Sequence, residues 1–185
     1  ALHSDPTWSV DGKYLYFQSD RDGEGLYRLA LKPDAFRISD VDMKFVKPSE
    51  PVKVEIDFDG IHRRITKMSA PNPSSDLIAA DDGRLYFLSR GDIYRVSYDG
   101  RETKKITTGG RRVAFRIMND GRRVTFMKGG EMYFARIDGG SETKITFEAD
   151  WIHDVNAERM AAFNEFWKTF NHRFYDANFH GRDWD

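Results

Sequence analysis

The acidic turn Asp20-Arg21-Asp22-Gly23-Glu24-Gly25 is the segment whose residue types could bind a metal ion most directly. Its carboxylates resemble the start of a calcium loop, in which side-chain oxygens at alternate positions are ligands. The twelfth position of such a loop requires a bidentate glutamate, but here it is Leu31, and strands rather than helices are expected on both sides. We therefore predict a solvated hairpin turn and no metal site.

The histidines are too far apart in the sequence to indicate a ligand set or a catalytic pair. His172 and His180 are eight residues apart and have no neighbouring third ligand, so a surface or core role is favoured. The absence of cysteine excludes disulfides, thiol catalysis and zinc–thiolate sites. We predict no catalytic, cofactor-binding or metal-binding residues in this chain. The five histidines are His3, His62, His153, His172 and His180.

Pairs of basic residues recur at strand ends and on outer strands. One interpretation is a positive lining that guides anionic groups, such as peptide carboxyl termini, through or past the protein. The other is protection of exposed strand edges by solvated charge, and this is the interpretation that we favour. The pairs are Arg63-Arg64, Lys104-Lys105, Arg111-Arg112 and Arg122-Arg123.

Composition limits the classes of partner. The 185 residues are 39% hydrophobic, 14% aromatic and 32% charged, with a net charge of -1. A near-neutral chain is not typical of nucleic-acid binders, which usually carry a clear basic excess. No run approaches the roughly 18 apolar residues that span a bilayer, so no membrane partner is expected. Ala1 lies just before the first repeat, so we expect the start of the sequence to be internal and uninformative about a signal peptide.

An internal repeat of about 40 residues organises the chain. In residues 79–107, the turn Asp82-Gly83 separates alternating apolar segments, which is a strong hairpin signal. Tyr94 follows Gly83 by 11 residues, and Tyr133 follows Gly121 by 12, so two copies are in register. A third, longer copy surrounds Gly12. Four short strands per repeat are the signature of propeller blades.

The predicted fold is therefore mainly β: a partial β-propeller of three four-stranded antiparallel blades, followed by an α-helix. We assign residues 1–148 to the blades, and expect an insertion, residues 32–51, to project outside blade one or to be poorly ordered. Residues 52–58 alternate between apolar and polar and are predicted to rejoin the sheet as a strand before the outer strand 63–68. Because propellers close with 4 to 8 blades, three blades leave sheet faces open, and the isolated chain is expected to associate.

Helical spacing replaces the strand pattern after Asn156. Apolar side chains recur at intervals of 3, 4, 3 and 4 residues, which predicts an amphipathic helix that needs a large hydrophobic partner. A helix capping the last blade is one interpretation, and the first helix of a further domain is the one that the aromatic content favours. The apolar positions are Met160, Phe163, Trp167, Phe170 and Phe174.

Three segments carry a family resemblance. The repeat at residues 9–23 resembles the propeller repeats of TolB and of tricorn proteases. Residues 54–65 and the string Phe166-Trp167 with 173–184 are more specific, and with them the chain resembles tricorn-type serine peptidases of the C-terminal-processing class. The resemblance implies that 1–148 are the last blades of a propeller, and that 149–185 are a linker and the first helix of a helical peptidase domain.

What the resemblance implies about function concerns a larger protein. The whole protein would be a homo-oligomeric, cytoplasmic or alternatively periplasmic serine peptidase that degrades oligopeptides without a cofactor. This portion would be its substrate-filtering propeller and scaffold. The family's catalytic histidine and serine lie beyond the matching stretch, so His180 is not assigned as a catalytic base, and this portion is expected to be inactive. Two alternatives stay open: a TolB-like protein-binding module and a relative of prolyl oligopeptidases.

Overall fold

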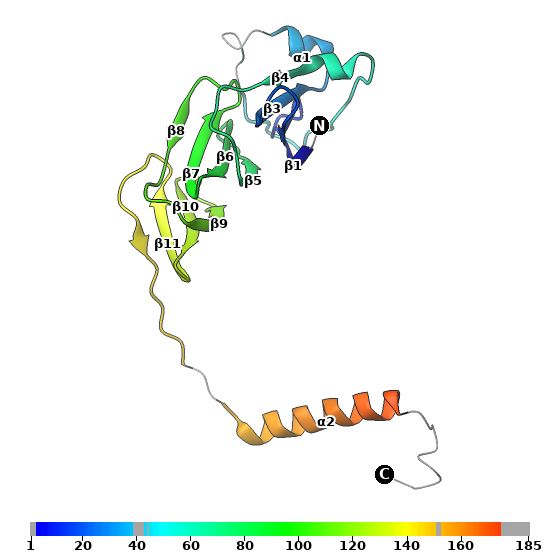
Figure 1. Cartoon of the computed structure of the whole chain (residues 1–185), viewed down its shortest axis with the longest axis vertical. Helices are drawn as coiled ribbons and strands as arrows, with labels where there is room; N and C mark the ends of the chain where they lie inside the picture. The colour runs from blue at the N-terminus through cyan, green and yellow to red at the C-terminus, as the bar shows by residue number, and fades with distance from the viewer. Residues whose placement is uncertain (1–2, 39–42, 44, 151–152, 175–185) are drawn as a thin grey trace. The chain divides into compact units, whose positions relative to one another are not determined.

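The computed structural model of the protein describes residues 3–38, 43, 45–150 and 153–174 (Figure 1). The chain divides into two compact units, Ala1–Thr146 and Phe147–Asp185. The first unit contains the strands, and the second contains the long helix. Each unit is described below by itself.

Twelve strands in the described part of the first unit form three separate four-stranded sheets, each with its strands in sequential order and antiparallel. We call them blade 1, blade 2 and blade 3. This confirms the predicted mainly-β partial propeller. Blade 1 is β1 (His3–Trp8), β2 (Tyr14–Ser19), β3 (Gly25–Ala30) and β4 (Ile65–Lys67). Blade 2 is β5 (Ser75–Ala79), β6 (Arg84–Ser89), β7 (Asp92–Ser97) and β8 (Thr103–Lys105). Blade 3 is β9 (Arg112–Ile117), β10 (Arg123–Lys128), β11 (Glu131–Arg136) and β12 (Thr143–Lys144).

The glycines predicted to turn the first strand of each blade into the second do so. Gly12, Gly83 and Gly121 have φ angles of 68°, 75° and 61°, a left-handed region that glycine adopts without steric cost. The amide of each glycine donates to the carbonyl three residues earlier, at 2.9, 3.1 and 2.8 Å respectively. The three turns are therefore equivalent points from which the blades can be compared.

Each blade also carries the same three side chains in register on its second, third and fourth strands. A phenylalanine stacks on a tyrosine across the sheet, with ring centroids 6.0, 6.0 and 6.1 Å apart in the three blades. A lysine pairs with that tyrosine on the outer strand. The sets are Phe17, Tyr27 and Lys67; Phe87, Tyr94 and Lys105; and Phe126, Tyr133 and Lys144.

The first strand of each blade contains a bulge that the sequence pattern did not predict. The register of β1 and β5 shifts within the strand, and that of β9 shifts where it pairs with β10. Asp5, Asp76 and Ala114 lie at these shifts with φ angles of 49°, 57° and 50°. Residues other than glycine rarely adopt this region, although aspartate tolerates it better than alanine does. The bulge is thus a repeated feature of the edge strand in all three blades.

Two apolar clusters join the blades. Between blades 1 and 2, side chains of β2 and β3 face those of β6 and β7, with Tyr16, Leu26, Leu85 and Phe87 fully buried. Between blades 2 and 3, Ile93 and the other face of β6 pack against β10 and β11. Because strand side chains alternate between faces, one strand of blade 2 supplies both clusters. Members of the second cluster include Tyr86, Leu88, Phe115, Val124 and Phe126.

Residues 52–58 do not form the predicted strand. Both edges of β3 are already paired, one with β2 and the other with β4, so the sheet has no free edge there to receive another strand. The amide of Asp57 donates to the carbonyl of Leu31 at 3.0 Å, but Val52 and Val54 are 40% exposed. A short helix, η1 (Ile61–Arg64), leads into β4, where an outer strand was expected over 63–68.

Of the insertion, residues 32–51, which we predicted to project or to be poorly ordered, the structure describes 32–38, 43 and 45–51. Its start forms α1 (Pro33–Arg37), in which Ala35 is buried. Met43 and Phe45 pack against the cluster between blades 1 and 2. The sequence pattern did not predict these two contacts, because it shows no sustained periodicity here and isolated apolar side chains are enough to cover the end of the cluster.

The second unit contains α2 (Val155–Arg173), which confirms the predicted helix. Asp154 caps it by accepting hydrogen bonds from the amides of Asn156 and Ala157, both at 3.0 Å. Phe170 lies near the rings of Phe166, Trp167 and Phe174, at 5.8, 6.0 and 5.1 Å. No residue of α2 is buried. In the part of the chain that the structure describes, no helix is both long and apolar enough to cross a bilayer.

Candidate functional site

The acidic turn at residues 20–25 is held by protein groups. The ammonium of Lys67 donates to the carbonyl oxygens of Asp22 and Gly23, at 2.9 Å each. The hydroxyl of Tyr27 also donates to the Gly23 carbonyl, at 2.8 Å. These oxygens therefore face hydrogen-bond donors. Among the described residues, no cluster of three or more histidine, cysteine, aspartate or glutamate side chains is arranged to hold a metal ion.

The structure gives the described histidines separate positions. His62 lies in η1 and is exposed, and His172 lies in the last turn of α2. His153 lies beside Glu158 at the start of the same helix. His180, which we did not assign as a catalytic base, lies outside the described residues.

The four basic doublets share a pattern that the sequence did not reveal. In each, the second residue pairs with an aspartate of the first unit. Lys105 reaches Asp92 at 2.8 Å and Arg112 reaches the same carboxylate at 2.7 Å. Arg64 and Arg112 are buried and so are neither a free positive lining nor solvated charge, whereas Lys105 and Arg123 are solvent-accessible. The other two pairs are Arg64 with Asp57, at 3.9 Å, and Arg123 with Asp120, at 2.8 Å.

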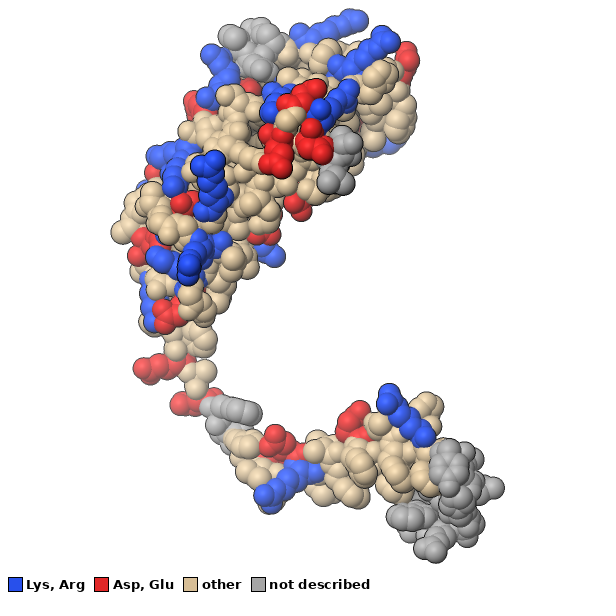
Figure 2. Space-filling view, viewed as in Figure 1, with Lys and Arg blue, Asp and Glu red and all other residues tan. Residues whose placement is uncertain are grey.

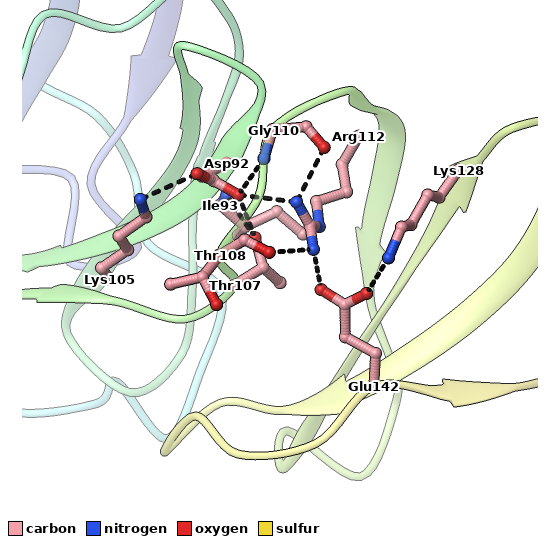
Figure 3. A network of polar contacts seen from close by, with 9 residues as sticks. All are labelled: Asp92, Ile93, Lys105, Thr107, Thr108, Gly110, Arg112, Lys128 and Glu142. Atoms are coloured by element: carbon pink, nitrogen blue, oxygen red, sulfur yellow. Dashed lines mark hydrogen bonds and ion pairs between the residues drawn. The ribbon is translucent and has the colours of Figure 1, made fainter.

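Arg112 is the centre of the most extensive polar network, which joins blade 2 to blade 3 (Figure 3). It is the first residue of β9 and is 1% exposed. Its Nη1 donates to Asp92 Oδ1 at 2.7 Å and to the Gly110 carbonyl at 2.8 Å. Its Nη2 donates to the Thr108 carbonyl at 2.6 Å and to Glu142 Oε1. The guanidinium thus bonds two carboxylates and two carbonyls at once.

Both carboxylates of the network are occupied on each oxygen. Asp92, at the start of β7, receives Arg112 and the Gly110 amide on Oδ1 and Lys105 on Oδ2. Glu142, between β11 and β12, receives Arg112 on Oε1 and Lys128 on Oε2, the latter at 2.9 Å. With every oxygen accepting from a cation, neither side chain is placed to remove a proton from a substrate. The network is therefore a clamp between blades.

The electrostatics agree with that role. Burial by itself raises the pKa of Asp92, but the hydrogen bonds from Lys105 and Gly110 and the charges of Lys105 and Arg112 outweigh it and lower the pKa below its ordinary value. Burial also raises the pKa of Glu142 by itself. The hydrogen bonds from Lys128 and Arg112 and the charges of these two residues outweigh it, so the pKa of Glu142 is lowered as well. Both side chains are ionised at neutral pH, where the clamp is complete.

At the other end of β9 from Arg112, a cleft of about 570 Å³ separates the first-strand ends of blades 2 and 3. Ile78, Tyr86, Ile117 and Met118 supply its apolar lining, and Asp82 and Asn119 lie on its polar side. On the face of the first unit drawn in Figure 2, positive and negative side chains are interspersed over the blades. The surface seen there therefore shows no single-sign field.

Neither the clamp nor the cleft was predicted from the sequence. The signal for the clamp was present in the doublet Arg111-Arg112 after Gly109-Gly110, because a basic side chain at a strand start beside a tight turn can point back under the previous blade. No signal for the cleft exists within one repeat. It depends on how two repeats meet.

Comparison with known proteins gives two matches that agree. Residues 155–185 match the family model of the tricorn protease C1 domain. A solved crystal structure of the tricorn protease is similar over 95% of this chain, with a TM-score of 0.59 and 13% sequence identity. At that identity, the structural match shows a shared fold. No curated protein matches.

The chain spans 20% of the length of the tricorn protease chain that it matches. The sequence match covers the segment beginning with α2, and the structural match extends over the three blades. The two matches rest on different information, one on residue identity and the other on backbone geometry. Together, the C1-domain match of residues 155–185 and the shared fold support a tricorn-type fragment.

Proposed function

We propose that this chain is the substrate-guiding propeller portion, and the opening of the helical domain, of a tricorn-like serine peptidase that hydrolyses oligopeptides. The observation that carries the proposal is the C1-domain match at residues 155–185, which follows directly on three propeller blades. The proposed role of the blades is to hold and filter peptides. The catalytic serine and histidine are proposed to lie outside these 185 residues.

The geometry of the first unit supports a scaffold. Its carboxylates with the most extensive contacts, Asp92 and Glu142, are bound by cations, and its core is shared between adjacent blades. A rigid array of blades can present edge strands to a passing peptide while leaving the chemistry to another domain. The charged side chains on those edges would then select among peptides.

The test is an assay of the full-length gene product beside the 185-residue chain. We expect the full-length protein to cleave fluorogenic peptides and to react with a fluorophosphonate probe for active serines, and the 185-residue chain to do neither. If the full-length protein shows neither activity, the TolB-like protein-binding module becomes the better account. Sedimentation and cell fractionation test the proposed homo-oligomer and its cytoplasmic, or alternatively periplasmic, location.

A substitution on an edge strand tests the filtering role. Arg116 is exposed on β9, and Arg136 is exposed on β11 of the same blade. In the full-length protein, Arg116→Glu should change kcat/KM for acidic relative to neutral peptides several-fold and leave fluorophosphonate labelling unchanged. Arg136→Glu is the matched charge reversal away from the edge strand. It should change neither the relative kcat/KM for acidic and neutral peptides nor the fluorophosphonate labelling. Equal effects of the two variants would argue against selection by the edge strands.

A further inference from the structure

Tyr98 fills the space between the first turns of blades 1 and 2. It follows β7 directly and is 2% exposed, and its ring centroid lies 5.3 Å from that of Tyr16. Its hydroxyl donates to the Ala80 carbonyl at 3.0 Å and accepts from the Val10 amide at 3.3 Å. One phenol therefore connects the turn of blade 1 with the turn of blade 2.

Ile137 occupies the same place in blade 3. The amide of Tyr98 donates to the Gly83 carbonyl and that of Ile137 to the Arg122 carbonyl, both at 3.0 Å. Each residue is followed by an aspartate and a glycine that close an equivalent turn. Isoleucine has neither the ring nor the hydroxyl of tyrosine. Its side chain cannot fill the corresponding space between blades 2 and 3.

The 570 Å³ cleft lies at that junction, between the turns of blades 2 and 3. By the equivalence of the turns, the partners of a phenol there are the amide of Asp81, corresponding to Val10, and the carbonyl of Met118, corresponding to Ala80. Both residues line the cleft. The Met118 carbonyl accepts from Gly121 at 2.8 Å, just as the Ala80 carbonyl accepts from Gly83 as well as from the phenol. A second donor can therefore be accommodated in the same way.

The surroundings of the two turn glycines also differ. Phe45 of the insertion lies edge-on to Tyr98, with ring centroids 5.1 Å apart, and a Cβ on Gly83 would lie 2.5 Å from its ring. At Gly121, no described atom lies within 4 Å of such a Cβ. The junction of blades 1 and 2 is thus covered by an aromatic side chain from outside the blades. The equivalent position of the next junction is open in the described structure.

We propose that the cleft between blades 2 and 3 binds a tyrosine side chain carried by an extended peptide. The ring packs on Ile78, Ile117 and Met118, and the hydroxyl lies between the Asp81 amide and the Met118 carbonyl. The volume falls within the range of about 300–1,000 Å³ typical of small-ligand sites. The inference rests on the packing of one junction compared with the other. It goes beyond the proposed function and does not depend on it.

The test uses methyl NMR of the 185-residue chain, labelled at isoleucine and methionine, with N-acetyl-L-tyrosinamide as the probe. We expect saturable shifts of the Ile78, Ile117 and Met118 methyl signals. N-acetyl-L-phenylalaninamide should bind about fivefold more weakly, because it lacks the hydroxyl and its hydrogen bonds. Intermolecular NOEs from the probe ring to the Ile117 and Met118 methyls locate the site without any variant.

Two variants of one residue complete the test. In Ile137→Tyr the protein's own ring fills the cleft, so the shifts at Ile117 and Met118 should disappear, whereas Ile137→Leu should retain them. The proposal is overturned if the unsubstituted chain shows no saturable shifts at these methyls, if the two probes bind equally, or if the NOEs come from other residues. Retention of the shifts in a folded Ile137→Tyr chain would overturn it as well.

Discussion

The two blade junctions of this chain are built from the same repeat but held together by different chemistry. Between blades 1 and 2, the Tyr98 phenol bonds both turns, Phe45 covers it, and the buried guanidinium of Arg28 donates to the Tyr98 carbonyl. Between blades 2 and 3, the buried guanidinium of Arg112 binds Asp92 and Glu142, and a cleft remains beside the turns. The repeated Phe–Tyr stack lies in both clusters, so it cannot account for the difference.

The difference shows that the repeat determines the strands of each blade but not the contacts between neighbouring blades. Position 98 holds a tyrosine where position 137 holds an isoleucine, and an insertion is available only to blade 1. One junction is then insensitive to protonation, because burial raises the pKa of Tyr98 far above the neutral range. The other depends on two ionised carboxylates. The two junctions should therefore respond differently to mutation and to pH.

The largest expected effect comes from Arg112→Met, which keeps the length and apolar stem of the side chain but removes its charge. The free energy of unfolding should fall by about 3–5 kcal/mol, because Asp92 and Glu142 lose a buried partner and two carbonyls lose a donor. Urea unfolding followed by circular dichroism measures it.

The matched control is Arg122→Met, in an exposed doublet member that directly precedes β10. Its effect should stay within about 0.5 kcal/mol. If Arg112→Met were no more destabilising than Arg122→Met, the clamp would not be what holds blade 3 to blade 2.

The second prediction concerns pH. The folded-state pKa values of Asp92 and Glu142 lie below their ordinary values of 3.8 and 4.5, so their contribution is complete above those values and is lost as the pH falls through the lowered ones. The destabilisation caused by Arg112→Met should therefore be constant from about pH 7 to 5 and should shrink below about pH 4. Urea unfolding of both proteins across this range tests it. A penalty that stayed unchanged in acid would show that packing of the arginine stem, not its charge, is responsible.

The third prediction tests the other junction. Phe45 is half-buried against Tyr98, whereas Phe58, in the segment after the insertion, is 73% exposed. Phe45→Ala should lower the free energy of unfolding by about 2 kcal/mol, roughly half the cost of truncating a fully buried phenylalanine. Phe58→Ala is the matched control and should cost less than about 0.5 kcal/mol. Equal effects would mean that Phe45 does not support the junction.

The sequence predicted what depends on local pattern. Turn glycines and alternating apolar positions sufficed for the blades, and the spacing from Met160 to Phe170 sufficed for α2. It failed for residues 52–58, whose alternation is that of a strand, because pairing depends on whether β3 has a free edge. It also failed for the clamp, because Asp92, Arg112 and Glu142 belong to different strands or loops of two repeats. Contacts between repeats require their relative placement, which no pattern within one repeat contains.

The smallest expected effect isolates the Tyr98 hydroxyl. Tyr98→Phe keeps the ring in the junction and removes the bonds to Ala80 and Val10, so the free energy of unfolding should fall by about 1 kcal/mol. This loss should be the same at about pH 7 and pH 4, because no ionised group takes part in it. Ile137→Tyr is the reverse change at the other junction, and a stabilisation there would show that the two positions are interchangeable. A Tyr98→Phe effect indistinguishable from zero would leave ring packing, not hydrogen bonding, as the feature that distinguishes the two junctions.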